Sequence, residues 1–207
     1  MPNRLEVRAI VVLVVLAIWL SYSITEVVKA NRESQARSQG ALGAWEKVYS
    51  VLISPRCINC HTATNYPQQG DDRHRHFANV VRGPAGIGVA GLNCESCHQE
   101  RNADSTGVPG GPGWHLAPLS MQWQDLNDRP LSSAAVCRAV VDRSKNENMS
   151  GPELLTHHEK AELVLWAWNP GRRPDGTLRT TPPLSHQEFV AATRTWVEAG
   201  TPCPKGR

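Results

Sequence analysis

Apolar residues dominate the beginning of the chain, and polar residues follow them abruptly. Residues 9–20 are almost wholly apolar, and as a helix the stretch from Leu5 to Val28 is long enough to cross a hydrocarbon layer of roughly 30 Å. We therefore predict a membrane anchor at residues 1–28 and a polar stalk at residues 29–43. A cleaved signal peptide is the alternative, although no A-x-A cleavage pattern follows the apolar run.

After the stalk, short helical patterns alternate with loops that are rich in glycine and proline. The first pattern places apolar residues on one helix face, at i, i+3, i+4 and i+7: Trp45, Val48, Tyr49 and Leu52. Turn-forming residues cluster at residues 62–93 and 105–130, where we expect loops.

Three further helices are predicted in the C-terminal third of the chain. Ser132 or Ser133 precedes a helix over residues 134–141. Capping-box patterns precede a helix over residues 157–168 and a last helix that ends at Gly200. We find no alternating pattern typical of strands.

The six cysteines carry most of the chemical information. Four of them belong to two C-x-x-C-H pentapeptides at residues 57–61 and 94–98, a spacing that is typical of covalent c-type haem attachment. The thiols would form thioethers with two haem c groups: Cys57 and Cys60, then Cys94 and Cys97. His61 and His98 would be the proximal iron ligands.

Two other chemistries use the same residue types. Zinc binds four Cys or His side chains, which the two pentapeptides together could supply. A thioredoxin-like C-x-x-C motif needs a βαβ context, which the sequence does not show. Covalent haem attachment takes place outside the cytoplasm, where a zinc thiolate would be exposed to oxidation. We therefore prefer haem, with the haem domain in the periplasm and the anchor in the inner membrane of a bacterium.

Each iron needs a sixth ligand or an open position. Met121 follows a proline in an irregular segment, as distal methionines often do. His115 lies between the second pentapeptide and Met121, and His76 follows a run of charged residues. All three are candidate distal iron ligands.

The remaining cysteines and several arginines have predicted partners. Cys137 and Cys203 form an even pair in an oxidising compartment, so we expect a disulfide between them. Arg73, Arg75 and Arg82 match haem propionates as bidentate donors, although solvated surface positions are equally consistent with the sequence. The formal net charge is +3 and Lys and Arg form no run, so nucleic acid is not an expected partner.

Several segments of residues 52–204 resemble small bacterial membrane-anchored dihaem cytochromes c that accompany periplasmic molybdenum hydroxylases of the isoquinoline and aldehyde oxidoreductase type. The similar segments are SPRCINCH, RGPAGIGVAGLNCESCHQ, GVPGGPGWHLAPLSMQW and PPLSHQEFVAATRTWVEAGTPCP. The resemblance implies a mainly α fold, in which an N-terminal transmembrane helix precedes a loop-rich dihaem cytochrome c domain at residues 44–207.

The same resemblance implies a function and two finer contacts. The protein would be an electron carrier and not an enzyme, with a periplasmic oxidoreductase as donor and the respiratory chain as acceptor. A haem enzyme with one open iron, reducing peroxide or nitrite, is the alternative. As in single-haem cytochromes c, an aromatic residue of the first helix, here Tyr49, would pack on Trp196 of the last. Met121 would serve the haem of His61 in preference to that of His98.

Overall fold

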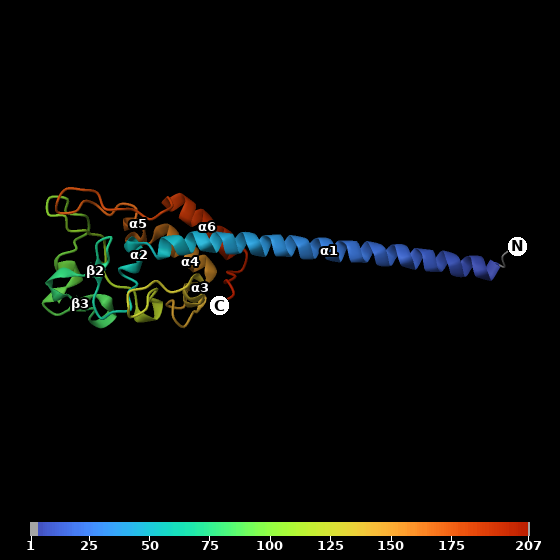
Figure 1. Ribbon diagram of the computed structural model, residues 1–207, viewed down its shortest axis with the longest axis horizontal. Helices are drawn as coiled ribbons and strands as arrows, with labels where there is room; N and C mark the ends of the chain where they lie inside the picture. The colour runs from blue at the N-terminus through green and yellow to red at the C-terminus, as the bar shows by residue number, and fades with distance from the viewer. Residues whose placement is uncertain (1–3, 207) are drawn as a thin grey trace. The chain divides into compact units, whose positions relative to one another are not determined.

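A computed structural model describes the backbone of residues 4–206 and the side chains of residue 19 and residues 22–206. The chain divides into two compact units, Met1–Gly40 and Ala41–Arg207. The described residues form six α-helices, joined by loops, short 3-10 turns and two small antiparallel ribbons (Figure 1). The helices are α1 (Arg4–Leu52), α2 (Pro55–Ile58), α3 (Ser133–Val141), α4 (Gly151–Lys160), α5 (Glu162–Trp166) and α6 (His186–Glu198).

The N-terminal part of the structure differs from the predicted transmembrane helix. Helix α1 runs continuously through residues 29–43. Among the side chains that the structure describes, no helix is long and apolar enough to cross a membrane. The prediction of a transmembrane helix is therefore wrong for the described structure. The uninterrupted apolar run of residues 9–20 reaches only about 18 Å as a helix, and most of its side chains lie outside the described ones.

The last turns of α1 belong to the hydrophobic core of the unit Ala41–Arg207. Trp45 and Val48 are fully buried. The ring of Trp45 lies 4.8 Å from the ring of Trp196 in α6, with 41° between the ring planes. The aromatic pair between the first and last helices thus involves Trp45 and not Tyr49. One turn later on the helix, the Tyr49 hydroxyl instead donates a hydrogen bond to the Leu131 carbonyl (2.7 Å), because a partly buried phenol needs a polar partner.

Two of the predicted helix starts are confirmed. The Ser132 hydroxyl accepts a hydrogen bond from the Ala135 amide (3.3 Å) at the start of α3. Ser185 and Glu188 form the capping box of α6, with the Ser185 amide donating to the Glu188 carboxylate (2.9 Å). Satisfying these free amides fixes where each helix begins.

The predicted helix over residues 157–168 is wrong. Helix α4 begins earlier, at the capping box of Ser150 and Glu153, where the Ser150 amide donates to the Glu153 carboxylate (2.7 Å). Ala161 then takes an extended conformation (φ −66°, ψ 128°), and the short helix α5 follows it. Helices α4 and α6 pack against each other in the core.

The predicted disulfide is confirmed. Cys137 of α3 is bonded to Cys203, with the Cα atoms 5.6 Å apart. The Trp196 indole donates to the Pro202 carbonyl (2.9 Å), which holds the segment after α6 against the core. The segment after α6 is therefore linked to α3 by the disulfide and to α6 by this hydrogen bond.

The segment between the two pentapeptides is mostly loop, stiffened by two antiparallel ribbons. In the first ribbon, β1 (Gln68–Gln69) pairs with β2 (His74–Arg75). In the second, β3 (Gly88–Val89) pairs with β4 (Leu92–Asn93), and the chain passes directly from β4 into Cys94. The second ribbon therefore sets the position of the second pentapeptide.

Candidate functional site

The first pentapeptide lies on a helical turn at the edge of the core. Pro55 begins α2, and the amides of Cys60 and His61 both donate to the Cys57 carbonyl (3.1 Å each). Ile58 is fully buried and anchors the turn in the core. Cys57, Cys60 and His61 therefore all belong to this one turn.

The His61 imidazole is oriented by two contacts. Its Nδ1–H donates to the Met121 carbonyl (2.7 Å). Its ring stacks on Trp123, with the ring centres 3.4 Å apart and only 5° between the planes. Because Nδ1 carries the proton, Nε2 keeps a lone pair for a metal. Burial lowers the pKa of His61 to about 3, which keeps the imidazole in its neutral, ligating form.

The thiols of the first pentapeptide are held in their protonated form. Burial raises the pKa of Cys57 to about 12 and the pKa of Cys60 to about 11. A redox dithiol uses a thiolate, which a lowered pKa would favour, so the surroundings of Cys57 and Cys60 do not suit that chemistry. The described residues contain no group of three or more His, Cys, Asp or Glu side chains that could hold a metal ion.

The second pentapeptide lies on a 3-10 turn, Cys94–Ser96, near the surface. The Asn93 side chain caps this turn by accepting from the Glu95 amide (2.9 Å), and the His98 amide donates to the Cys94 carbonyl (2.9 Å). Cys97 is exposed. Both pentapeptides thus fold as one turn, although only the first is embedded in the core.

The His98 imidazole is oriented in the same way as His61. Its Nδ1–H donates to the Pro109 carbonyl (2.7 Å), and its ring stacks on Trp114 at 4.5 Å with 4° between the planes. The glycine-rich run after the pentapeptide makes this possible. A Cβ on Gly110 would lie only 2.3 Å from the Arg101 carbonyl oxygen, so a larger residue would push the Pro109 carbonyl away from the imidazole.

The chain therefore contains the same constellation twice: two free cysteines, a histidine bonded through Nδ1 to a backbone carbonyl, and a stacked tryptophan. No protein-family model, curated protein or solved structure matches this chain. The internal repetition is consequently the best guide to the chemistry of the site. Two histidines reach the same orientation from unrelated surroundings, which indicates a shared ligand type.

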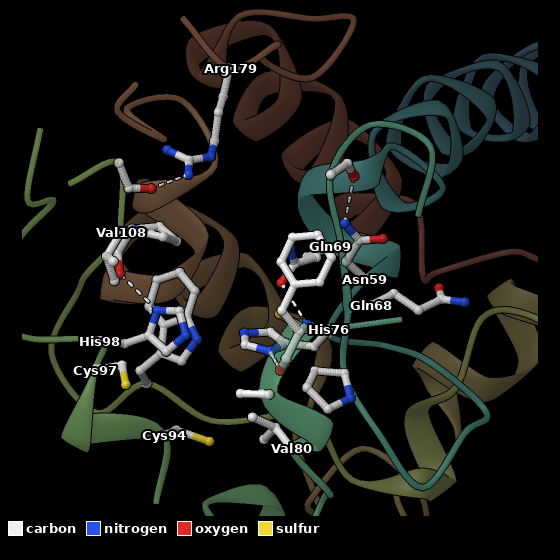
Figure 2. Close-up of a pocket in the computed structure, with 18 of the residues that line it drawn as sticks. Asn59, Gln68, Gln69, His76, Val80, Cys94, Cys97, His98, Val108 and Arg179 are labelled. Carbon is white, nitrogen blue, oxygen red and sulfur yellow. Dashed lines mark hydrogen bonds between the residues drawn. The ribbon is translucent and has the colours of Figure 1, made fainter. Parts of the chain in front are cut away.

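A cavity of about 710 Å³ lies between the second constellation and Cys60 of the first. Its wall includes Cys60 of the first pentapeptide and Cys94, Cys97 and His98 of the second (Figure 2). The charge of Cys94 contributes to the raised pKa of Cys60, so the two attachment turns lie close together. A large planar group bonded at Cys94 and Cys97 would find space here.

The candidate distal ligands are distributed unevenly around this cavity. His76 lines it and faces His98, with the ring centres 5.9 Å apart. His115 also lines it, and its Nδ1–H donates to the Gly113 carbonyl (2.5 Å). Met121 is instead buried in the hydrophobic core, with its carbonyl bonded to His61.

The three arginines that the sequence suggested for propionates are engaged elsewhere. Arg82 is buried and donates to backbone carbonyls, among them that of Thr62 (2.9 Å). Arg75 lies over the Tyr66 ring at 4.6 Å. Arg73 donates to a backbone carbonyl in the loop before α3. These side chains stabilise loops around the cavity.

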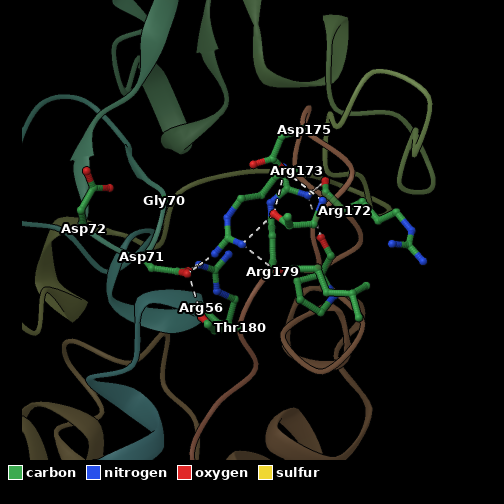
Figure 3. A network of polar contacts seen from close by, with 12 residues as sticks. Arg56, Gly70, Asp71, Asp72, Arg172, Arg173, Asp175, Arg179 and Thr180 are labelled. Atoms are coloured by element: carbon green, nitrogen blue, oxygen red, sulfur yellow. Dashed lines mark hydrogen bonds and ion pairs between the residues drawn. The ribbon is translucent and has the colours of Figure 1, made fainter.

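A different arginine cluster lines the cavity, and the sequence analysis missed it. Arg56, Arg173 and Arg179 gather around one carboxylate, that of Asp71, which forms ion pairs with Arg56 and Arg173 (Figure 3). The Thr180 hydroxyl also donates to Asp71 (2.9 Å). Arg56 adjoins Cys57 in the sequence, which was the available signal. The other two arginines come from a loop with no chemical motif.

Proposed function

We propose that this protein is a dihaem c-type cytochrome that transfers electrons outside the cytoplasm. The repeated constellation carries the proposal: in both pentapeptides the histidine donates Nδ1–H to a carbonyl at 2.7 Å and stacks on a tryptophan. A redox dithiol needs a thiolate, whereas burial raises the pKa values of Cys57 and Cys60.

Each residue of the constellations has a role in this proposal. Thioethers would form at both cysteine pairs, and His61 and His98 would bind iron through Nε2. A bound haem supplies one-electron exchange between ferrous and ferric iron. The Met121 and Pro109 carbonyls hold the imidazoles in the right tautomer and orientation, which also raises their basicity as ligands.

The two pentapeptides differ in how closely a partner protein can approach them. Cys97 is exposed, so a partner protein can approach the second attachment site closely. Cys57 packs against the hydrophobic core, which shields the first site from water. Because both pentapeptides contribute cysteines to one cavity wall, electrons can pass between the two sites within the same fold.

Met121 does not suit the distal position of the first site. Its carbonyl binds the Nδ1 side of His61, which points away from a metal at Nε2. A sixth ligand has to approach from the opposite face of the haem, and the Met121 side chain is buried in the core beside Trp123. His115 is the proposed sixth ligand of this site, because its charge contributes to the lowered pKa of His61 and it therefore lies near that imidazole.

The proposed partners come from the family resemblance. A periplasmic oxidoreductase of the molybdenum hydroxylase type would donate electrons, and the respiratory chain would accept them. The Cys137–Cys203 disulfide supports an oxidising compartment, where such partners are found.

Mass spectrometry tests the proposal after expression in a host that attaches haem c in its periplasm. The wild-type chain should gain the mass of two haems, and Cys94→Ser/Cys97→Ser should gain one. The matched control, Cys137→Ser/Cys203→Ser, also replaces two cysteines and should keep both haems. A wild-type chain without added haem, or one that contains zinc, contradicts the proposal.

A further inference from the structure

We infer that His76 is the sixth ligand of the haem attached at Cys94 and Cys97, so that this iron is held between His98 and His76. The inference rests on the proposed function, because it needs haem at the second pentapeptide. It adds the distal residue and therefore the ligation type of one particular haem.

The separation of the two rings carries the inference. The centres of the His76 and His98 rings are 5.9 Å apart, with 68° between the ring planes. A metal–nitrogen bond of about 2 Å on each side, plus about 1 Å from each nitrogen to its ring centre, requires about 6 Å. The angle between the planes is compatible, because each ring can rotate about its own metal bond. The two rings are therefore spaced for one iron between them.

The hydrogen bonds leave the correct nitrogen free on both rings. The His76 Nδ1–H donates to the Phe77 carbonyl (2.7 Å), and the His98 Nδ1–H donates to the Pro109 carbonyl (2.7 Å). Nε2 of each imidazole therefore keeps its lone pair. In Figure 2, His76 and His98 lie on opposite sides of the cavity, with Cys94 and Cys97 at one end of it.

The first ribbon holds His76 in this place. His76 follows β2 directly, and its amide donates to the Pro67 carbonyl (3.0 Å), which continues the pairing of β1 with β2. The Gln69 side chain accepts from the next amide, that of Phe77 (3.3 Å). The backbone on both sides of His76 is thus fixed, so the imidazole is presented to the cavity by a stiff hairpin.

The arginine cluster completes the site at the end opposite the thiols. Arg179 lies at the other end of the cavity from Cys94 and Cys97 (Figure 2), and it belongs to the cluster with Arg56 and Arg173. Asp71 forms ion pairs with Arg56 and Arg173, while Arg179 donates to backbone carbonyls, among them that of Pro170 (3.1 Å), so positive charge exceeds negative charge in this cluster. Burial lowers the pKa of Arg179, and the neighbouring arginine charges lower it further. Haem propionates lie across the macrocycle from the vinyl groups, so they would meet this charge.

His74 is the rival ligand and provides the matched control. It also lines the cavity, but its Nδ1 pairs with the Asp72 carboxylate (2.6 Å). Its Nε2 is buried and has no hydrogen-bond partner in the described structure. The ring contact with His98 is made by His76 and not by His74. Comparing variants at these two positions separates a specific ligand from a general effect on the ribbon.

The test measures spin state and ligand binding on the purified two-haem protein. In the wild type, both haems should be low-spin by electron paramagnetic resonance and near-infrared magnetic circular dichroism. His76→Ala should convert one haem of two to high spin, bind carbon monoxide at that haem when reduced, and regain low spin when imidazole is added. His74→Ala should keep both haems low-spin. Mass spectrometry on the same samples reports haem attachment separately, so a wild-type chain without attached haem would count against the proposed function and not against the ligand.

Two results overturn the inference. One is a His76→Ala protein with two attached haems that are both low-spin and do not bind carbon monoxide. The other is a spin-state change in His74→Ala in place of His76→Ala. If His76→Ala does not accumulate, His76→Met retains a ligating side chain. It should raise the midpoint potential of one haem, because methionine ligation favours ferrous iron. Unchanged potentials at both haems in that variant also overturn the inference.

Discussion

The two pentapeptides share their spacing, their carbonyl-bonded histidine and their stacked tryptophan, yet they lie in opposite environments. The first turn begins at Pro55, buries Ile58 and packs Cys57 against the core. The 3-10 turn of the second has no buried residue, and Cys97 is exposed. The same local sequence therefore produces the same proximal geometry, while the surrounding fold determines how much water each site meets.

Because of this difference, we expect the first site to affect the stability of the fold and the second to affect the properties of the cofactor. Removing a side chain at the first site leaves a hole in the core formed by α1, α3, α4 and α6, so stability should fall. The second site is built from loops around a cavity, so changes there should alter cofactor properties more than folding. The predictions below test that division.

The two tryptophans that stack on the histidines should differ most. Trp123 is 4% exposed and belongs to the core cluster, so Trp123→Ala should lower the free energy of unfolding by about 3–5 kcal/mol. Trp114 is only partly buried, and Trp114→Ala should cost no more than about half as much. Denaturant titration of both variants measures the difference.

A conservative variant shows which part of Trp123 matters. Its indole N–H has no hydrogen-bond partner in the described structure, so Trp123→Phe should change the unfolding free energy by less than about 1–2 kcal/mol. Equal losses for Trp123→Ala and Trp114→Ala would show that the two sites are equally embedded, and the comparison would be wrong.

Local patterns in the sequence predicted the parts of the site that lie close together along the chain. Ser132 and Ser185 cap helices as their positions indicate, and each pentapeptide forms a single turn. The pairing of Cys137 with Cys203 followed from the even count of cysteines left over. The helix caps and the turns each follow from a rule about residues close together in the sequence. The disulfide follows because only two cysteines lie outside the pentapeptides.

Contacts between residues that are far apart in the sequence were not predictable in this way. Arg173 meets Asp71 only because the loop after α5 returns to the β1–β2 ribbon, 102 residues away in sequence. The position of His76 opposite His98 likewise depends on how the ribbon folds back over the second turn. Nor did any local pattern indicate that the Met121 carbonyl would accept the hydrogen bond from His61.

Acid should destabilise the core around the first site through His158. Burial lowers the pKa of His158 to about 3, and its Nδ1 is hydrogen-bonded to the Thr193 hydroxyl (3.0 Å). Because its pKa in the unfolded chain is about 6.5, the unfolded state binds more protons between these two values, and stability falls as the pH drops through that range. From pH 7 to pH 5 the expected loss is about 2 kcal/mol.

Thermal unfolding at the two pH values measures this loss. His158→Asn retains an amide at the position of the hydrogen bond to Thr193 and does not titrate, so its unfolding free energy should be about 2 kcal/mol less sensitive to pH than that of the wild type. An equal pH dependence in the two proteins would place the acid-sensitive group elsewhere.

The smallest expected effect is a shift in the potential of the second haem. Arg179→Gln removes a positive charge from the cavity wall, and ferric iron, which carries one more positive charge than ferrous, is then stabilised. The midpoint potential of the haem at His98 should fall by a few tens of millivolts, and that of the haem at His61 should change less. Arg179→Lys keeps the charge, so the potential should remain near that of the wild type. Arg75 lies over the Tyr66 ring, and Arg75→Gln should shift the potential of neither haem. A redox titration measures both potentials. Equal shifts at both haems would mean that the arginine cluster acts on the two sites alike, and the two sites would then not differ in their electrostatic surroundings.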